Sequence, residues 1–560
     1  MTRRRANEEQ VRVINLTEVV MNIKEAKQEV VNTVKAYLMK DETGAYRIPV
    51  EKQRPVLLMG PPGIGKTAIM EQIAEELNIN LVSYTITHHT RQSAIGLPYI
   101  SKKNYGGEDY SVTEYTMSEI IASIYDQIER SGVKEGILFL DEINCVSETL
   151  APTMLQFLQY KTFGSHRVPE GFVIVTAGNP PEYNKSVRDF DIVTLDRVKR
   201  IDILEDFKVW KEYAYKMEVC GAILAYLEIK KDRFYSVKAG VEGKHFVTAR
   251  GWEDLSRIIK VYEDMELPVT RDLVAEYIGD PEIARDFATY YELYNKYRVT
   301  YQVPSILAGE FPKDVRAIVT APFDEKLSLL GLMIETLNRE FRKYAENLDI
   351  QREVFAEVKK LKEAAGGSSA AGSSENAAEA GSSAGGSSGS AGDSGKAGAA
   401  GASVHGDAGL LDILRTNHDF LKLQMERNIK AHMLSRYQER IQKKILSALE
   451  ELEEKLTLSG GDDAELFTLA KQWFTEREAA RTGAVRTTGD HLTNAFEFIN
   501  KTFGEGQELV IFLSDLNAGF YSLKFISECG NEAYYKYNQY LLLKDQRAKL
   551  RDEVMKVMEI

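Results

Sequence analysis

Hydrophobic residues in the first 200 positions recur with two different spacings. Between residues 17 and 40 they recur at helical spacing, which predicts a lead-in helix. From Pro55 onward, short apolar runs alternate with stretches of helical spacing. Five of these runs predict strands: RPVLLMG, NLVSYTI, GILFLDE, GFVIVTAGN and RIDILE. Strands that alternate with helices predict an α/β fold, in which helices cover both faces of a parallel sheet.

The pattern changes after about residue 206, where strands largely stop and helical spacing predicts a helical lid. Residues 365–407 are mostly Gly, Ser and Ala, and cannot bury enough apolar surface to fold, so we expect a flexible linker there. Helical spacing resumes beyond it and predicts a separate all-α domain. The predicted parts are a helical lead-in (1–54), an αβα core (55–206), the lid (207–364), the linker (365–407) and the C-terminal domain (408–560).

Composition and charge narrow the class of protein. Of 560 residues, 44% are hydrophobic and 28% are charged, which is ordinary for a soluble protein. The formal net charge of −13 disfavours generic nucleic-acid binding, which needs surplus Lys and Arg. The three cysteines, Cys145, Cys220 and Cys529, are too widely spaced to suggest disulfides or a zinc site. No stretch approaches the roughly 18 apolar residues of a membrane span, so we expect a cytoplasmic protein without one.

The stretch MGPPGIGKTAIM follows the first predicted strand and opens a helix. It fits G-x-x-x-x-G-K-[ST], and the strand-to-helix setting is the one that this motif requires. Glycines let the backbone N–H groups point toward a phosphate, and the helix dipole adds to the attraction. We expect Lys66 to neutralise the β- and γ-phosphates and the Thr67 hydroxyl to bind Mg²⁺. The predicted nucleotide-binding residues of this loop are Gly60, Pro61, Pro62, Gly63, Ile64, Gly65, Lys66, Thr67 and Ala68.

Polar residues end two further predicted strands. GILFLDEIN presents Asp141, which we expect to hold Mg²⁺ through its coordinated waters, and Glu142, which we expect to orient and deprotonate the attacking water. TAGNPP ends a neighbouring strand at Asn179, whose amide would lie where the water and the γ-phosphate meet. Pro180 and Pro181 then restrict the backbone that carries this amide.

Together these residues resemble the motifs of the AAA+ ATPases, in particular the MoxR-like and dynein-related members of the helix-2-insert group. GPPGIGKT is similar to the Walker A motif, ILFLDE to Walker B, and Asn179 to the sensor 1 residue. Residues 91–119 resemble the hairpin that is inserted into helix 2 in that group. The resemblance covers residues 55–345 and does not extend to residues 408–560.

The resemblance also implies roles for arginines. TLDRVKR is similar to the family's L-x-R-F segment, which makes Arg197 the candidate arginine finger that reaches the γ-phosphate of a neighbouring subunit. Val198 stands where Phe is usual in the family, so Arg200 stays open as an alternative. VTARGWEDL is similar to the start of the sensor 2 helix, with Thr248 as its N-cap and Arg250 contacting ATP from the lid.

An arginine finger that acts in trans implies a homo-oligomeric ring, which the resemblance makes a hexamer. The resemblance thus implies Mg²⁺-dependent ATP hydrolysis that remodels or matures a client protein, often one with a von Willebrand A domain. In similar inserts aromatic residues grip the substrate in the ring pore; here Tyr99, Tyr105, Tyr110 and Tyr115 either do so or pack within the hairpin. Two alternatives are a nucleic-acid-directed motor of restriction or defence type, which the acidic charge disfavours, and a nucleotide-gated scaffold, which the full set of catalytic residues disfavours.

Overall fold

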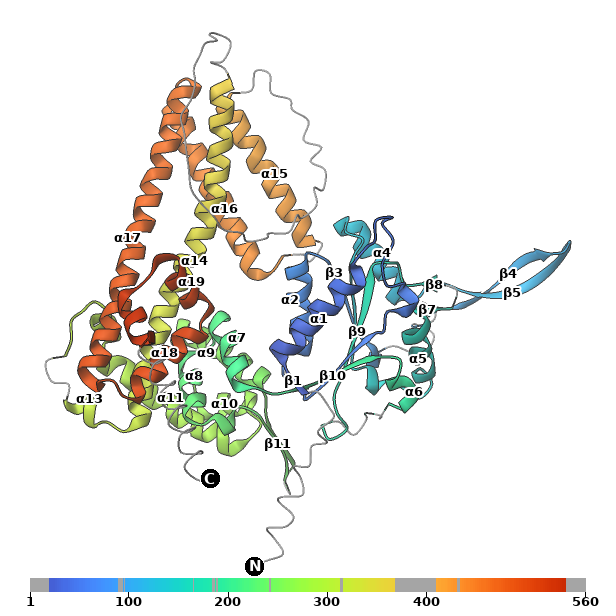
Figure 1. Ribbon diagram of the computed structural model, residues 1–560, viewed down its shortest axis with the longest axis horizontal. Coiled ribbons are helices and arrows are strands. Elements are labelled where there is room, and N and C mark those ends of the chain that lie inside the picture. Colours follow the sequence, from blue (N-terminus) through green and yellow to red (C-terminus); the bar gives the residue numbers. More distant parts are fainter. Residues whose placement is uncertain are drawn as a thin grey trace, which may run out of the picture. The chain divides into compact units, whose positions relative to one another are not determined.

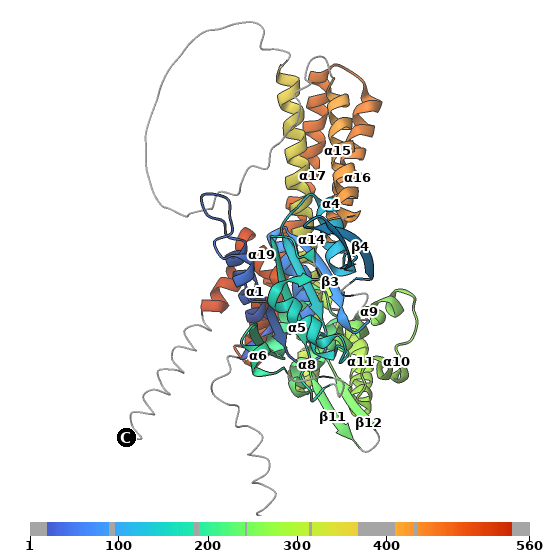
Figure 2. The same cartoon turned by 90° about the vertical axis from the view of Figure 1, so that its right-hand side faces the viewer.

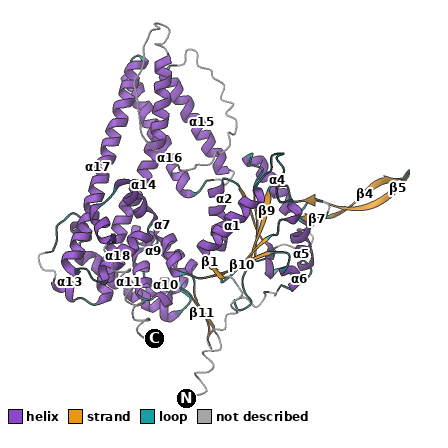
Figure 3. Ribbon diagram, in the orientation of Figure 1, coloured by secondary structure: helices purple, strands orange, loops and turns teal. Residues whose placement is uncertain are grey.

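The computed structural model describes residues 20–88, 94, 96–164, 166–183, 187, 190–240, 243–312, 316–367, 409–430 and 434–539. The chain divides into two compact units. Unit 1 comprises Met1–Ala345, Arg427–Ser435 and Val485–Ile560, and unit 2 comprises Glu346–Glu426 and Arg436–Ala484. In the described residues all strands belong to unit 1 (Figure 3).

A parallel sheet lies at the centre of unit 1 (Figure 1). Its order is β1-β10-β2-β9-β6-β3, and every neighbouring pair runs parallel. The strands are β1 (Val20–Asn22), β2 (Val56–Met59), β3 (Asn80–Thr85), β6 (Gly136–Asp141), β9 (Phe172–Gly178) and β10 (Lys199–Leu204). All except β1 coincide with runs predicted as strands, although β10 begins one residue before its run, and the parallel α/β fold class is confirmed.

Side chains of the central strands alternate between two hydrophobic layers. On β2, Val56 and Leu58 pack into one layer, and Leu57 and Met59 pack into the other. The first layer includes α1 (Ile23–Leu38) and α2 (Lys66–Leu77), and the second includes α4 (Glu119–Ser131) and α5 (Ala151–Tyr160). Helices therefore cover both faces of the sheet, as predicted, and the strands are buried on both sides.

The lead-in helix starts later than predicted. Val20–Asn22 form the edge strand β1, which pairs with β10, and α1 begins only at Ile23. Asn22 and Glu25 form a capping box, in which Asn22 Oδ1 accepts from the Glu25 backbone N–H at 2.9 Å and Glu25 Oε2 accepts from the Asn22 N–H at 3.0 Å. This polar cap fixes the start of the helix, whereas the apolar spacing alone placed it too early. Residues 17–19 of the predicted helix lie outside the described residues.

The insert predicted from the resemblance contains an antiparallel hairpin of β4 (Pro98–Tyr105) and β5 (Glu108–Tyr115), which projects from the layered part of unit 1 (Figure 1). Its two-residue turn is Gly106–Gly107, with φ of 65° and 95°, which is the left-handed conformation that a tight hairpin turn requires. Tyr99 donates to Glu114 and Tyr110 to Glu108, each at 3.0 Å. The four tyrosines of the hairpin nevertheless remain 39% to 55% exposed.

Helices dominate the chain after β10, as predicted. The described ones up to residue 320 are α6 (Ile192–Leu195), α7 (Phe207–Lys216), α8 (Gly221–Ile229), α9 (Ala249–Asp264), α10 (Arg271–Tyr277), α11 (Pro281–Tyr301), α12 (Val303–Leu307) and α13 (Arg316–Thr320), of which α6 precedes β10. An aromatic cluster of Tyr226, Trp252 and Phe287 joins α8, α9 and α11. Two short hairpins complete unit 1: β7 (Thr162–Phe163) with β8 (His166–Arg167), and β11 (Ser236–Gly240) with β12 (Gly243–Val247).

Two C-terminal helices, α18 (Gln507–Ala518) and α19 (Phe520–Cys529), pack with the helices of unit 1. The buried Lys211 of α7 bonds Glu228 of α8 at 2.6 Å and Asp515 of α18 at 2.5 Å. Burial acts to lower the pKa of Lys211, but the two carboxylates outweigh it and raise the pKa. We call these three residues the Lys211 cluster. No single described helix is long and apolar enough to cross a membrane; α18 and α19, bent by 89°, pass that test only as a pair.

Unit 2 consists of helices that run side by side in two perpendicular views (Figures 1 and 2). They are the later part of α14 (Phe323–Gly367), α15 (Leu410–Lys430), α16 (Arg436–Ser459) and the earlier part of α17 (Asp463–Phe503). The chain breaks between α16 and α17 at Gly460 and Gly461, with φ of 61° and 126°. Residues 368–408, which include most of the predicted linker, lie outside the described residues, and the predicted domain limits stay predictions.

Candidate functional site

The loop between β2 and α2 is shaped by its glycines. Gly63 and Gly65 have φ of 73° and 99°, which favours glycine because a Cβ is strained there. A Cβ on Gly60 would lie 2.6 Å from the carbonyl oxygen of Ile203. Gly65 is the N-cap of α2 and provides no capping side chain, so the N–H groups of the first turn lack that partner. A curled loop that ends in such a helix terminus is suited to bind an anion.

Lys66 lies inside this loop and is 7% exposed. Its Nζ donates to the carbonyl oxygens of Gly60 and Pro61, each at 2.8 Å. A third hydrogen bond reaches Asn179 Oδ1 at 2.9 Å. These acceptors are neutral and match the three donors of an ammonium group. Among the described residues, the side-chain hydrogen bonds of Lys66 all go to neutral oxygens, and no carboxylate lies within ion-pair distance of its ammonium group.

Burial lowers the pKa of Lys66 to about 8. The carboxylate of Asp141 opposes this effect, the charge of Arg250 adds to it, and the carboxylate of Glu142 opposes it. Burial dominates because an ammonium ion loses hydration that nearby dipoles do not fully replace. A phosphate in the loop would supply the missing negative charge, so the electrostatics of Lys66 suit an anionic ligand.

A hydroxyl and a carboxylate meet next to the loop, where α2 begins and β6 ends. Thr67 Oγ1 donates to Asp141 Oδ2 at 2.9 Å. Asp141 Oδ1 accepts from the backbone N–H of Glu142, also at 2.9 Å. Mg²⁺ is usually held by one or two carboxylates, phosphate oxygens and waters, so this pair fits such an ion. The described residues contain no group of three or more His, Cys, Asp or Glu side chains that could hold a metal alone.

Glu142 has the left-handed backbone conformation, with φ of 57° and ψ of 36°. Few residues other than glycine adopt it, because the Cβ is crowded there. The turn ends β6 and leads into the short 3-10 helix η3 (Ile143–Cys145). Glu142 thus turns the chain away from the direction of β6. It does so at the carboxyl end of the strand, and the phosphate loop follows the carboxyl end of β2.

Asn179 directly follows β9, which lies between β2 and β6 in the sheet. This strand order brings Asn179 next to both the phosphate loop and the acidic turn. Its side chain bonds Lys66, and its carbonyl oxygen accepts from Asn144 Nδ2 at 2.8 Å. Sequence reasoning missed Asn144, although it stands two residues after Glu142, because polar residues that follow a strand are usually exposed. Asn144 is only 3% exposed.

The lid segment contacts the phosphate loop at three points. Thr248 caps α9 as predicted, and its Cβ would lie 2.9 Å from a Cβ on Gly63. The backbone N–H of Arg250 donates to the Gly63 carbonyl at 3.2 Å. Tyr235, which sequence reasoning missed, donates its hydroxyl to the Pro62 carbonyl at 2.9 Å. The lid segment therefore contacts the loop at Pro62 and Gly63.

The structure does not bring Arg197 or Arg200 to the phosphate loop of their own chain by any recorded contact of the described residues. Arg197 follows the short helix α6 and its side chain is exposed. Arg200 lies on β10 and pairs with Asp202, with its Nη2 2.8 Å from Asp202 Oδ1. The choice between the two as an arginine finger stays a prediction.

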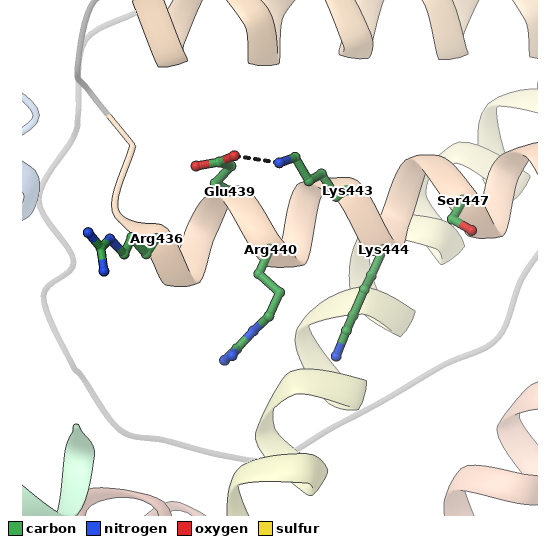
Figure 4. A pocket seen from close by; sticks show the side chains of 6 residues that line it. All are labelled: Arg436, Glu439, Arg440, Lys443, Lys444 and Ser447. Atoms are coloured by element: carbon green, nitrogen blue, oxygen red, sulfur yellow. Dashed lines mark hydrogen bonds and ion pairs between the residues drawn. The ribbon is translucent and has the colours of Figure 1, made fainter. Parts of the chain in front are cut away.

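Unit 2 has a hollow of about 430 Å³ on the surface of α16 (Figure 4). It is lined by Arg436, Glu439, Arg440, Lys443, Lys444 and Ser447. Lys443 pairs with Glu439 at 2.5 Å, and Lys444 pairs with Glu346 at 2.8 Å. Arg440 also pairs with Glu346. Because these two carboxylates pair with three of the basic groups and offset part of their charge, the hollow is a poorer anion site than the phosphate loop.

Residues 55–198 match the model of the AAA domain (dynein-related subfamily). The chain carries an AAA domain. The matched stretch of this AAA domain includes the phosphate loop, Asp141, Glu142, Asn179 and Arg197. The match supports the AAA+ resemblance for this stretch of the chain.

No curated protein matches the chain significantly. The structure of this chain is similar to 375 chains of solved structures. One is a mutant of RuvB from Thermotoga maritima, with 14% sequence identity and a TM-score of 0.26. The match covers 53% of this chain and 75% of that chain. Nothing about activity follows from a likeness at this level.

Proposed function

We propose that this chain is a Mg²⁺-dependent ATPase that forms a homo-oligomeric ring, a hexamer, and remodels or matures a client protein. The observation that carries the proposal is the buried ammonium of Lys66, which is held by neutral acceptors next to the Thr67–Asp141 pair. The match of residues 55–198 to the AAA domain supports nucleotide hydrolysis as the general activity.

In the proposed reaction, each residue of the site has its own role in phosphoryl transfer. The N–H groups of the phosphate loop and the ammonium of Lys66 would bind the β- and γ-phosphates of ATP. Thr67 and Asp141 would hold Mg²⁺, which neutralises charge on the phosphate oxygens. Glu142 would accept a proton from the attacking water, and Asn179 would orient that water against the γ-phosphate.

A neighbouring subunit would complete this site with Arg197. The exposed Arg197 lies beside Ile192 and Val193 of α6, which are 84% and 55% exposed. Exposed apolar side chains next to an exposed arginine suit a surface that a second copy covers. This supports Arg197 as the arginine finger and the ring as the active assembly, with Arg200 held by its own ion pair.

The client would be a protein, in the MoxR-like manner, and a von Willebrand A-domain protein is the first candidate. The exposed tyrosines of the β4–β5 hairpin support a surface that grips an extended chain. The same hairpin disfavours a nucleic-acid motor, because Lys102 and Lys103 are outnumbered there by Glu108, Asp109 and Glu114.

The experiment is to measure phosphate release and nucleotide binding by the full chain and by Glu142→Gln. We expect the wild type to release phosphate from ATP with Mg²⁺, and Glu142→Gln to bind ATP with near-normal affinity but to lose turnover. The matched control is Glu129→Gln, which changes an exposed carboxylate on α4 and should keep full activity. Undiminished phosphate release by Glu142→Gln would remove Glu142 from the mechanism.

A second measurement separates the two kinds of client. The ATPase rate is compared with a von Willebrand A-domain protein, with duplex DNA and with RNA. Stimulation by the protein alone is expected. Stimulation by DNA or RNA alone would replace the remodelling proposal with the nucleic-acid motor.

A further inference from the structure

The backbone hydrogen bonds between β6 and β9 do not extend to Glu142 and Asn179, the two residues that would act on the γ-phosphate. Pairing between β6 and β9 ends at Leu140 and Thr176. Glu142 and Asn179 both lie beyond that last pair. The sheet therefore does not by itself fix the distance between them, although catalysis at one phosphate would require both to be placed accurately.

One side chain bridges this gap. Asn144 of η3 donates from Nδ2 to the carbonyl oxygen of Asn179 at 2.8 Å. Its own backbone is tied to Glu142, because the N–H of Cys145 donates to the Glu142 carbonyl at 2.9 Å and closes the turn. Ile143, which is 1% exposed, anchors η3 in the core. A shift of Asn179 is thereby passed to the turn that carries Glu142.

The fit of Asn144 is close on its other side as well. A Cβ on Gly178 would lie 2.6 Å from Asn144 Oδ1, so position 178 accepts only glycine while the amide stays in place. Asn144 Oδ1 is buried and has no hydrogen-bond partner in the described part of the chain. A buried polar atom without a partner is costly, and such atoms are rare in native proteins. A residue chosen only for stability would avoid this cost.

We propose that Asn144 is a positioning residue that fixes Glu142 and Asn179 relative to each other at the γ-phosphate. The inference rests on the proposed ATPase function and adds a role that the motifs do not assign. Asn144 touches neither the phosphate loop nor the predicted metal ligands by any recorded hydrogen bond of the described residues, so it acts through Asn179 and Glu142.

The test compares turnover and binding in Asn144→Ala and Asn144→Asp, using the full chain. Both variants lose the donor to the Asn179 carbonyl, and Asn144→Asp keeps the shape of the side chain. We expect kcat to fall about ten- to a hundredfold, the range expected when a reacting group is misplaced by about 1 Å. The Kd for a non-hydrolysable ATP analogue should stay within about twofold, because Lys66 and the loop glycines are unchanged. Wild-type kcat in Asn144→Asp would overturn the proposal.

The matched control is Asn80→Ala. Asn80 is also a buried asparagine, 1% exposed, and its Nδ2 also donates to a backbone carbonyl, that of Val133, at 2.7 Å. It lies at the start of β3, at the opposite end of the sheet from the site. We expect Asn80→Ala to lower Tm but to keep kcat. An equal loss of kcat in both alanine variants would mean that Asn144 is structural.

A double-mutant cycle tests the packing independently. Gly178→Ala should lower kcat because the new methyl group displaces the Asn144 amide. Its effect should shrink at least about threefold in the Asn144→Ala background, where that amide is absent. Additive effects would refute the coupling. If the wild type itself shows no ATP hydrolysis, the proposed function fails; if the wild type is active and these variants match it, only the role of Asn144 fails.

Discussion

Nucleotide affinity should weaken as the pH rises through 8, because of the buried Lys66. In the free protein burial lowers the pKa of Lys66 to about 8 from the ordinary 10.5. A bound phosphate would stabilise the ammonium and raise the pKa again, so binding above pH 8 must take up a proton. Nucleotide affinity is therefore highest well below pH 8 and falls as the pH rises through this value.

The magnitude follows from the fraction of free protein that carries the charged form. With a pKa of about 8, roughly nine-tenths of Lys66 is charged at pH 7 and roughly one-tenth at pH 9. If the bound state stays charged throughout, the apparent Kd rises about tenfold between these pH values, or about 1.4 kcal/mol. The phosphates of the nucleotide add little to this change, because their last pKa lies near 6 to 7.

The assay is isothermal titration calorimetry with a non-hydrolysable ATP analogue and Mg²⁺ at pH 7, 8 and 9. Each pH is measured in two buffers with different ionisation enthalpies, so that the heat reports proton uptake. We expect uptake of close to one proton at pH 9 and close to none at pH 7. An unchanged Kd together with no proton uptake at pH 9 would refute the reasoning from burial.

Lys161→Met is the matched control for this titration. Burial lowers the pKa of Lys161 to about 8 as well, but its Nζ donates to the Val50 carbonyl, away from the phosphate loop. The variant removes a second buried ammonium with the same pKa and leaves the site intact. It should therefore keep the tenfold effect. Loss of the effect in Lys161→Met would assign the titration to the wrong lysine.

Two further predictions concern the assembly and the lid. Arg197→Ala should be inactive alone, and mixing it with Lys66→Met, which keeps its finger, should restore part of the phosphate release; no rescue in assembled mixed rings would exclude a finger that acts in trans. Lys211→Met leaves the buried Asp515 of the Lys211 cluster without its ion pair, whereas Glu228 keeps its pair with Lys231, and the variant should destabilise unit 1 by about 3 to 5 kcal/mol in denaturant titrations. Lys24→Met, which breaks the exposed ion pair between Lys24 of α1 and Glu212 of α7, should cost at most about 1 kcal/mol. Equal losses of stability in Lys211→Met and Lys24→Met would show that burial does not make the Lys211 cluster more important for stability than an exposed ion pair.

The central strands could be predicted because burial on both faces makes them nearly continuous hydrophobic runs. VLLM of β2 and FVIVTAG of β9 are examples, and both were placed correctly. The edge strand β1 has only three residues, and its apolar positions fit a helix equally well. The β11–β12 hairpin has exposed apolar residues such as Val237 and Phe246 and no buried run, so it gave no strand signal.

Some residues of the candidate site could also be predicted from the sequence, and others could not. The glycines, Lys66 and Thr67 lie in one local motif, and their spacing alone indicates a phosphate loop. Asn144 and Tyr235 contribute through hydrogen bonds to residues 35 and 173 positions away, respectively. No local pattern marks such partners, because the contact exists only after the strands have assembled. Motifs thus indicate what touches the nucleotide, whereas the structure indicates what holds those groups in place.

The phosphate loop is in contact with residues of both the sheet and the lid. Asn179 bonds Lys66 from the sheet, while Arg250 and Tyr235 bond the loop carbonyls from the lid. A ligand that draws Lys66 away from its neutral acceptors would break its bond to Asn179 on the sheet side. On the sheet side the bond of Asn144 leads to the turn of Glu142. On the lid side the Lys211 cluster joins α7 and α8 to α18.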